Sequence, residues 1–282
     1  MDGFLLINKT QGMTSHDVVS SVKKKFHIEK IGHTGTLDPF ACGLLILVFG
    51  KATKLAHLFQ EQNKTYEGVI AFGNHYDTYD ITGTILKTKT PLLNINTLQK
   101  AAESMIGTYH QEPPMYSAIK KDGRKLYELA RQGKEVERKT RPVHIFDFRI
   151  INQLDHQRYR FYTSVSKGTY IRSLAVDVAR KLDEVAALES LNRVSIGKYH
   201  IEQSKKIEET TKDDIILLTD YFSDYPKLMV NDYLLKLVQN GVYLDERQIK
   251  TELPFVVCDE KGGMVAYYEP ISTFKYKPIL IF

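Results

Sequence analysis

The sequence predicts an α+β protein in which mostly antiparallel strands are flanked by helices. Several segments alternate with the period of two that is typical of strands, such as Lys64–Gly73. Two others, Val143–Ile151 and Arg158–Val165, flank a turn and are typical of an antiparallel hairpin. Amphipathic helices are predicted between the strands, most clearly at Asn96–Ile106. Hydrophobic residues make up 43% of the 282 positions, which is sufficient for a large core.

The N-terminal part is predicted to contain a short buried strand and then a helix. Phe4–Ile7 is an apolar run of strand length. Thr14 or Ser15 is suited to cap the following helix, and Asp17 lies where the positive end of the helix dipole favours an acid. We expect this helix to continue to about Phe26.

The segment Gly32–Pro39, GHTGTLDP, is predicted to be a rigid loop that leads into a central strand, Leu44–Val48. Its glycines permit sharp turns, and the proline biases the preceding aspartate towards an extended backbone. The loop is expected to present the carboxylate of Asp38 close to the imidazole of His33. Taken alone, the pattern fits a braced turn equally well, because aspartate is a common turn and cap residue.

The middle of the chain continues with shorter elements. Thr53–Phe59 is predicted to form one or two helical turns, and His75–Gly83 a polar, turn-rich connection. Another helix is predicted to begin at Thr169 or Tyr170, which places Arg172 in its first turn. Because the helix dipole disfavours a cation there, we expect a functional or buried carboxylate partner for this arginine.

Tyr225-Pro226 is the predicted boundary between a large domain, residues 1–225, and a small β-rich module, residues 226–282. The module is predicted to hold a short helix at Asp232–Val238. Two strands, Phe255–Val257 and Met264–Tyr268, flank the turn sequence DEKGG and are typical of a hairpin.

Composition limits the cellular setting and the partners. The two cysteines, Cys42 and Cys258, form neither a disulfide framework nor a metal-ligand cluster, and no apolar run is long enough to span a bilayer, so the cytoplasm is the expected location. Basic clusters occur at Lys23–Lys25, Lys120–Lys125 and Arg138–Arg141. Each alone is typical of a solvated surface, but together with 17 tyrosines they favour a nucleic-acid groove.

Eight segments match one family in their order along the chain. They are NKTQGMTSHD, GHTGTLDPFACGLL, KTYEGVIAFG, DTYDITG, PPMYSAIKKDGRKLYELARQG, RPVHIFDF, SKGTYIRSLAVDVA and LNRVSIG, and they cover most of residues 3–200. The chain thereby resembles the bacterial tRNA pseudouridine-55 synthases, the TruB family of pseudouridine synthases. GHTGTLDP and SKGTYIRSL are the most specific of these motifs.

The resemblance implies a fold, a reaction and a partner. The fold would be a pseudouridine-synthase catalytic domain on a mixed, mostly antiparallel sheet, with an RNA-clamping insertion at residues 117–141 and a C-terminal PUA-like RNA-binding module. The enzyme would flip uridine 55 out of the T loop of tRNA and isomerise it to pseudouridine. The resemblance implies that the enzyme requires no cofactor, no metal and no protein partner. It also implies a monomer with no membrane partner.

The resemblance also assigns candidate site residues. Asp38 matches the catalytic aspartate, and Arg172 matches the arginine that pairs with it and keeps it ionised. Tyr66 matches the tyrosine that stacks on the target base and assists proton removal. Tyr170 and Leu191 match the other residues that contact the base.

Two further residues are assigned to substrate binding by the same resemblance. His33 matches the histidine that occupies the space left by the flipped nucleotide, where a planar ring offsets part of the roughly few kcal/mol that flipping costs. Lys9 matches a lysine near the active site that supports the loop. Whether Asp38 attacks the uracil ring or the anomeric carbon, or only stabilises a sugar cation, stays open.

Three alternative functions are compatible with parts of the sequence. One is a non-catalytic RNA-binding or tRNA-folding protein on the same scaffold, although such a protein would not require Asp38, Tyr66 and Arg172 together. Another is the guided ribosomal-RNA relative, which carries a larger C-terminal domain than this chain. The third is an aspartate-dependent glycosidase, which needs two carboxylates, with Asp77 or Asp80 as the second.

Overall fold

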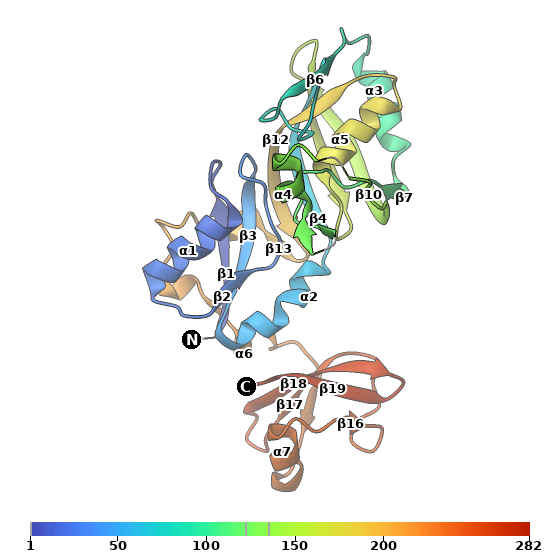
Figure 1. Cartoon of the computed structure of the whole chain (residues 1–282). Helices are drawn as coiled ribbons and strands as arrows, with labels where there is room; N and C mark the ends of the chain where they lie inside the picture. The colour runs from blue at the N-terminus through green and yellow to red at the C-terminus, as the bar shows by residue number, and fades with distance from the viewer. Residues whose placement is uncertain (1, 122, 135) are drawn as a thin grey trace.

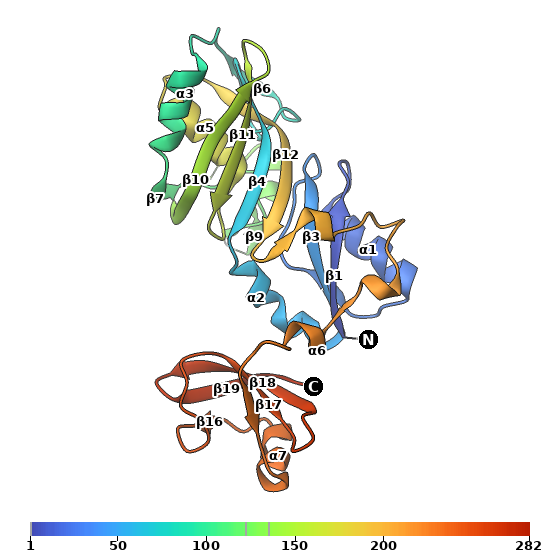
Figure 2. The ribbon, with the colours of Figure 1, turned by 180° about the vertical axis from the view of Figure 1, so that it is seen from behind.

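The computed structural model describes residues 2–121, 123–134 and 136–282 and confirms the predicted α+β class (Figures 1 and 2). A large sheet with its helices forms the upper part of the view, and a separate small sheet lies at the lower end. Two positions of the predicted clamping segment 117–141, Asp122 and Glu135, fall outside the described residues. One of them, Asp122, also belongs to the basic cluster Lys120–Lys125.

Over the part of the chain that the structure describes, the large sheet has ten strands and runs in the order β14-β1-β3-β12-β4-β11-β10-β7, with β2 paired to β3 and β13 paired to β12. Within the described residues, its strands pair antiparallel except for β3 and β12, which are parallel. The strands are β1 (Gly3–Lys9), β2 (Ile31–His33), β3 (Cys42–Phe49), β4 (Lys64–Phe72), β7 (Gly107–Gln111), β10 (Arg141–Gln153), β11 (Arg158–Val165), β12 (Ala186–Ile196), β13 (Tyr199–His200) and β14 (Ile216–Leu217).

Helices cover both halves of this sheet. One core cluster joins α3 and α5 to the half built from β4, β10, β11 and β12, and both helices lie on the same side of it (Figures 1 and 2). The helices are α1 (Ser15–Phe26), α2 (Ala56–Gln60), α3 (Ile95–Glu103), α4 (Leu126–Arg131), α5 (Ile171–Arg180), α6 (Leu218–Tyr221) and α7 (Asp232–Gln239). None of the helices in the described part of the chain is long and apolar enough to cross a membrane.

The start of α1 follows the prediction in detail. The Thr14 side chain accepts a hydrogen bond from the Asp17 amide at 3.1 Å, and the Asp17 carboxylate accepts one from the Thr14 amide at 2.8 Å. This reciprocal capping satisfies amides that the first turn leaves without partners. The helix ends at Phe26, as expected.

Strand β3 is buried on both faces, which explains its continuous apolar sequence. Leu45, Leu47 and Phe49 pack with α1, whereas the alternate residues Leu44 and Ile46 belong to a second cluster with α2 and the small sheet. The predicted central strand is therefore confirmed, and it carries the Gly32–Pro39 loop at its N-terminal end.

The structure differs from several predictions. Gly32 and His33, predicted as the first residues of the Gly32–Pro39 loop, lie in strand β2 and pair with Val48 and Leu47 of β3. The connection His75–Gly83 begins inside a short hairpin, β5 (Asn74–Tyr76) with β6 (Ile85–Thr88). The turns expected at Thr53–Phe59 start earlier, as a 3-10 helix over Gly50–Leu55 that continues into α2. Strand β12 has no counterpart among the predicted strands.

The small sheet runs in the order β15-β17-β18-β19-β16. Its strands are β15 (Lys227–Met229), β16 (Leu244–Asp245), β17 (Phe255–Cys258), β18 (Met264–Ser272) and β19 (Lys275–Ile281), and a separate hairpin in the 117–141 segment pairs β8 (Lys120–Lys121) with β9 (Arg124–Lys125). The predicted hairpin around DEKGG is confirmed. All five strands follow residue 226, although the exact domain boundary stays a prediction.

An aromatic cluster joins the small sheet to the rest of the chain. The ring of Phe222, just after α6, lies 4.6 Å from that of Tyr267 on β18 and 5.6 Å from that of Phe282. Beside this cluster, Nε2 of His57 lies 2.9 Å from Oε1 of Glu269. Aromatic and polar contacts therefore both hold the small sheet against α2 and α6.

Candidate active site

The Gly32–Pro39 loop is held through its backbone by buried polar side chains. The hydroxyl of Ser15, at the start of α1, accepts from the Leu37 amide at 2.9 Å and donates to the Leu37 carbonyl at 3.2 Å. The ammonium of Lys9 donates to the carbonyls of Met13 at 2.7 Å and Pro39 at 3.4 Å. Lys9 is completely buried, so its side chain supports the loop from within the protein.

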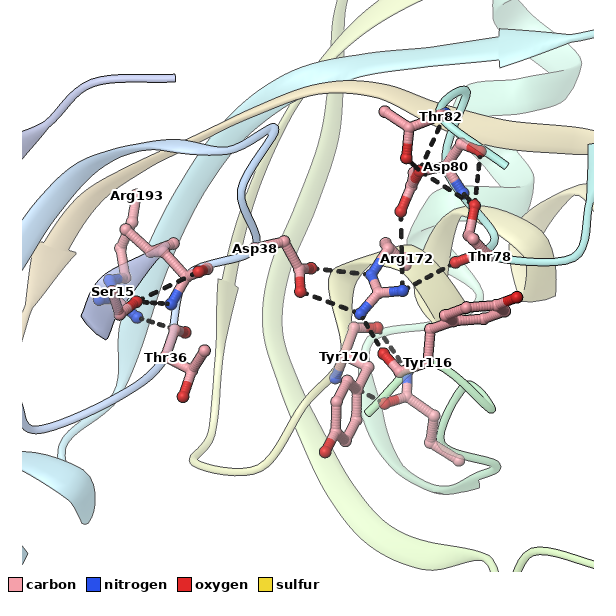
Figure 3. A network of polar contacts seen from close by, with 12 residues as sticks. Ser15, Thr36, Asp38, Thr78, Asp80, Thr82, Tyr116, Tyr170, Arg172 and Arg193 are labelled. Atoms are coloured by element: carbon pink, nitrogen blue, oxygen red, sulfur yellow. Dashed lines mark hydrogen bonds and ion pairs between the residues drawn. The ribbon is translucent and has the colours of Figure 1, made fainter. Parts of the chain in front are cut away.

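Asp38 extends from this loop towards Arg172 in the first turn of α5 (Figure 3). The Arg172 Nε donates to Oδ2 at 2.8 Å, and Nη2 donates to Oδ1 at 3.0 Å. The Asp38 side chain is 32% exposed and that of Arg172 only 5%. The Asp38 carboxylate is thus accessible from solvent and is held on its other side by a buried guanidinium. Asp38 is the carboxylate partner that the sequence predicts for Arg172.

The remaining donors of Arg172 are also occupied. Nη1 donates to the Thr78 carbonyl and Nη2 to the Tyr116 carbonyl, each at 2.8 Å. A second carboxylate, that of Asp80, lies 3.6 Å from Nη1 and is nearly buried. Asp80 is fixed in turn by Thr82, whose amide donates at 3.0 Å and whose hydroxyl donates at 2.5 Å. Arg172 therefore lies between two carboxylates and is held in place by two backbone carbonyls.

The other predicted base-contacting residues lie near these groups in the fold. Tyr66 on β4 and Leu191 on β12 are buried in the core cluster that also contains Leu37 of the loop. Tyr170 directly precedes α5, and burial raises the pKa of its phenol. Its amide donates to the Gln111 side chain at 2.8 Å, and its carbonyl accepts from the same side chain at 3.1 Å.

Comparison with known proteins identifies the family of this chain. A model of the N-terminal domain of the TruB family pseudouridylate synthases matches residues 23–171. The tRNA pseudouridine synthase B of Onion yellows phytoplasma (strain OY-M) is 48% identical over 283 residues, which cover 100% of both chains. The chain belongs to the TruB family. The predicted family membership and the predicted enzyme class, a pseudouridine synthase, are confirmed.

More distant proteins also resemble this TruB-family chain. The tRNA pseudouridine synthase B of Clostridium acetobutylicum is 41% identical over 90% of this chain and 89% of its own. The crystal structure of a Cbf5-Nop10-Gar1 complex contains a chain that superposes with a TM-score of 0.72 over 96% of this chain and 79% of that one, at 21% identity. At that identity the likeness concerns the fold alone.

His33 of this TruB-family chain ends β2, beside β3. Burial lowers the pKa of its imidazole, and the nearby charges of Arg193 and His16 lower it further. The ring is therefore mainly neutral at pH 7. Its Nδ1 is buried and has no hydrogen-bond partner within the described part of the chain.

Sequence reasoning missed four polar residues of the site in their structural roles: Ser15, Asp80, Gln111 and Arg193. From sequence, Asp80 is a candidate only as the second carboxylate of a glycosidase, and Ser15 only as a helix cap. Their contacts reach across the fold, so local pattern gives no indication of them.

Across residues 2–121, 123–134 and 136–282, no group of three His, Cys, Asp or Glu side chains is arranged to hold a metal ion.

Proposed function

We propose that this chain isomerises uridine to pseudouridine at position 55 in the T loop of tRNA, with Asp38 as the nucleophile. One observation carries the proposal: the partly exposed Asp38 carboxylate is paired side-on with the buried guanidinium of Arg172. The curated relatives, which are named tRNA pseudouridine synthase B, support uridine in tRNA as the substrate.

The reaction requires the base to leave the helical stack and turn over. The N1–C1′ bond breaks, the uracil rotates, and a C5–C1′ bond forms. C5 then loses its proton and N1 gains one, so that atoms and electrons balance without an oxidant. Asp38 would form a covalent intermediate with either the ring or the sugar, as carboxylates do in other enzymes. Its pairing with Arg172 orients the carboxylate for attack, because two hydrogen bonds fix both of its oxygens.

The remaining candidate residues would position the base. Tyr66 would stack on the uracil and assist removal of the C5 proton, and Tyr170 and Leu191 would enclose it. A neutral His33 would occupy the space that the flipped nucleotide leaves, because a neutral imidazole can still accept a hydrogen bond from RNA. Lys9 would act indirectly, since its ammonium already donates to the backbone carbonyls of Pro39 in the loop and of Met13 before α1.

The glycosidase alternative is disfavoured by the surroundings of Asp80. A glycosidase needs two carboxylates that flank the sugar bond. Here the guanidinium of Arg172 contacts both Asp38 and Asp80 and lies between them (Figure 3). Asp77 is engaged elsewhere, by the Thr84 amide at 2.8 Å and the Tyr116 hydroxyl at 3.3 Å. A purely RNA-binding protein would have no use for this oriented carboxylate.

Two further regions of the chain would bind RNA. Residues 117–141 would close over the RNA, with cations such as Lys120, Arg124 and Lys139 directed at phosphates. Residues 226–282 would form a PUA-like RNA-binding domain separate from the catalytic domain, residues 1–225. Because phosphate contacts release counterions, affinity for tRNA should fall as salt rises. The chain would act as a monomer without a protein partner.

The test is pseudouridine formation in a T-arm stem-loop by the purified chain. We expect conversion at position 55 only, and none in a stem-loop with cytidine at that position. Asp38→Ala should abolish conversion while RNA affinity stays within a few fold, because the substitution removes the nucleophile and few RNA contacts. Full activity of Asp38→Ala, or no conversion by the wild type, would overturn the proposal.

A further inference from the structure

Arg193 on β12 reaches into the loop that carries Asp38 (Figure 3). Its Nη2 donates to the Gly35 carbonyl at 3.1 Å, and Nη1 donates to the Thr36 carbonyl at 3.5 Å. On the other edge of the guanidinium, Nε donates to the Leu44 carbonyl of β3 at 2.8 Å. One rigid fork therefore connects loop residues that precede Asp38 with the strand that follows it.

The environment of this guanidinium is unusual for a charged group. Arg193 is only 2% exposed. In the part of the chain that the structure describes, Arg193 takes part in no ion pair. Its hydrogen-bond acceptors there are the backbone carbonyls of Gly35, Thr36 and Leu44. Buried charges are generally paired with an opposite charge, because burial without one is costly. The carbonyls of the loop and of β3 compensate this charge, and the loop must keep its shape to do so.

The backbone of Arg193 is fixed by the parallel contact between β12 and β3. Arg193 lies opposite Gly43, and Asn192 opposite Cys42. A Cβ at Gly43 would lie 2.5 Å from the Arg193 carbonyl oxygen and 2.6 Å from its nitrogen, so only glycine permits this approach. The guanidinium is thus extended from a rigid anchor rather than from a mobile segment.

The pairing of Asp38 with Arg172 depends on two supports that are independent of each other. Arg172 is held on its own side by the carbonyls of Thr78 and Tyr116. It therefore does not follow Asp38 when the loop moves. The loop is supported on the opposite side by Arg193, Ser15 and Lys9.

We propose that Arg193 is a positioning residue for Asp38, which sets the register of the loop carbonyls and thereby the distance between the carboxylate and the reacting base. The inference rests on the proposed role of Asp38 as nucleophile. Loss of the fork shifts the loop relative to Arg172 and slows the chemical step, whereas the phosphate contacts proposed for residues 117–141 and 226–282 are preserved. A misplacement of about 1 Å at a reacting group costs about a hundredfold in rate.

Lys64 provides a matched control. It is also a buried cation, and it donates to three backbone carbonyls, those of Phe59, Gln60 and Gln62, at 3.3, 2.7 and 2.5 Å. These carbonyls belong to α2 and its end, not to the Asp38 loop. Lys64→Met and Arg193→Met therefore each remove a buried cation with three carbonyl partners, but only the second removes support from the loop.

The experiment measures single-turnover pseudouridine formation at saturating T-arm stem-loop, the dissociation constant of the same RNA, and the thermal midpoint. We expect Arg193→Met to lower the single-turnover rate by about a hundredfold, at a temperature where every variant is folded. Its RNA affinity should stay within threefold of wild type. Lys64→Met should keep the wild-type rate despite a lower thermal midpoint. Equal rates for Arg193→Met and wild type, or equal rate losses in both Met variants, would overturn the inference.

Arg193→Lys keeps the test decisive should the Met variant fail to fold. A lysine retains the charge, but its single ammonium cannot reproduce the planar fork that joins the loop to β3. We expect a folded protein with normal RNA affinity and a rate lowered at least about tenfold, since each tenfold step needs only about 1.4 kcal/mol. A wild-type rate would refute the positioning role. An inactive wild type would instead refute the proposed function, so the two failures are distinct.

Discussion

Arg172 meets Asp38 side-on, with Nε 2.8 Å from Oδ2 and Nη2 3.0 Å from Oδ1. Both carboxylate oxygens are engaged, and the outer part of the side chain still reaches solvent. This geometry fixes the plane of the carboxylate as well as its position. Such a constraint is more demanding than a charge alone, because a point charge would let the carboxylate rotate.

Arg172→Lys should therefore be a severe substitution although it keeps the charge. An ammonium cannot bond both oxygens of Asp38 and also the carbonyls of Thr78 and Tyr116. We expect the single-turnover rate to fall by about a hundredfold or more, as for other losses of catalytic orientation. RNA affinity, measured in parallel, should change little. A rate within threefold of wild type would show that charge is sufficient.

Asp80→Asn should weaken the support of Arg172 from behind. The substitution keeps the shape and the acceptor for Thr82 but removes the buried negative charge 3.6 Å from Nη1. We expect a rate about tenfold lower, which corresponds to ~1.4 kcal/mol, and a lower free energy of unfolding. Asp155→Asn is the control, because Asp155 also pairs with an arginine but on an exposed turn. Equal behaviour of the two variants would contradict the prediction.

Phe222→Ala should loosen the small sheet from the rest of the chain. The Phe222 ring is fully buried and contacts those of Tyr267 and Phe282, so its removal leaves a cavity between the two parts. We expect a loss of about 3–5 kcal/mol in the free energy of unfolding, measured with urea. Tyr233→Ala, at an exposed position of α7, should cost less than ~0.5 kcal/mol. A small effect at Phe222 would mean that the aromatic contact contributes little.

The ammonium of Lys64 should make stability depend on pH in the alkaline range. Burial lowers its pKa from 10.5 to about 8. Between these values the unfolded chain binds a proton that the native chain lacks, so the free energy of unfolding should rise with pH. The slope is at most about 1.4 kcal/mol per pH unit. Urea titrations of wild type and Lys64→Met from pH 8 to 10 isolate this group, and a difference that stays constant with pH would disprove the assignment.

Local chemistry explains which parts of the fold could be predicted. The start of α1 was predicted because Thr14 and Asp17 are three residues apart and cap the helix by themselves. Strand β12 was missed because bulges between Leu188 and Ser190 and between Arg193 and Ser195 interrupt its alternation. The sequence around Arg193 gives no indication that this arginine is buried.

The candidate site was predictable only in part for the same reason. An arginine in the first turn of a helix is unfavourable by itself, so the need for a carboxylate partner was visible in the sequence. Asp80 and Gln111 act through contacts with residues 92 and 59 positions further along the chain, Arg172 and Tyr170, and no periodicity indicates such contacts.

The position of β12 has a consequence for synthesis on the ribosome. This strand lies between β3 and β4 in the sheet, yet it follows both by more than a hundred residues in the chain. Until Ile196 has left the exit tunnel, β4 exposes the edge that later pairs with β12, and β3 exposes its edge at Cys42 and Gly43. Exposed edges attract other strands. Nascent chains halted before Ala186 should accordingly bind chaperones or aggregate, whereas chains extended beyond His200 should become resistant to protease.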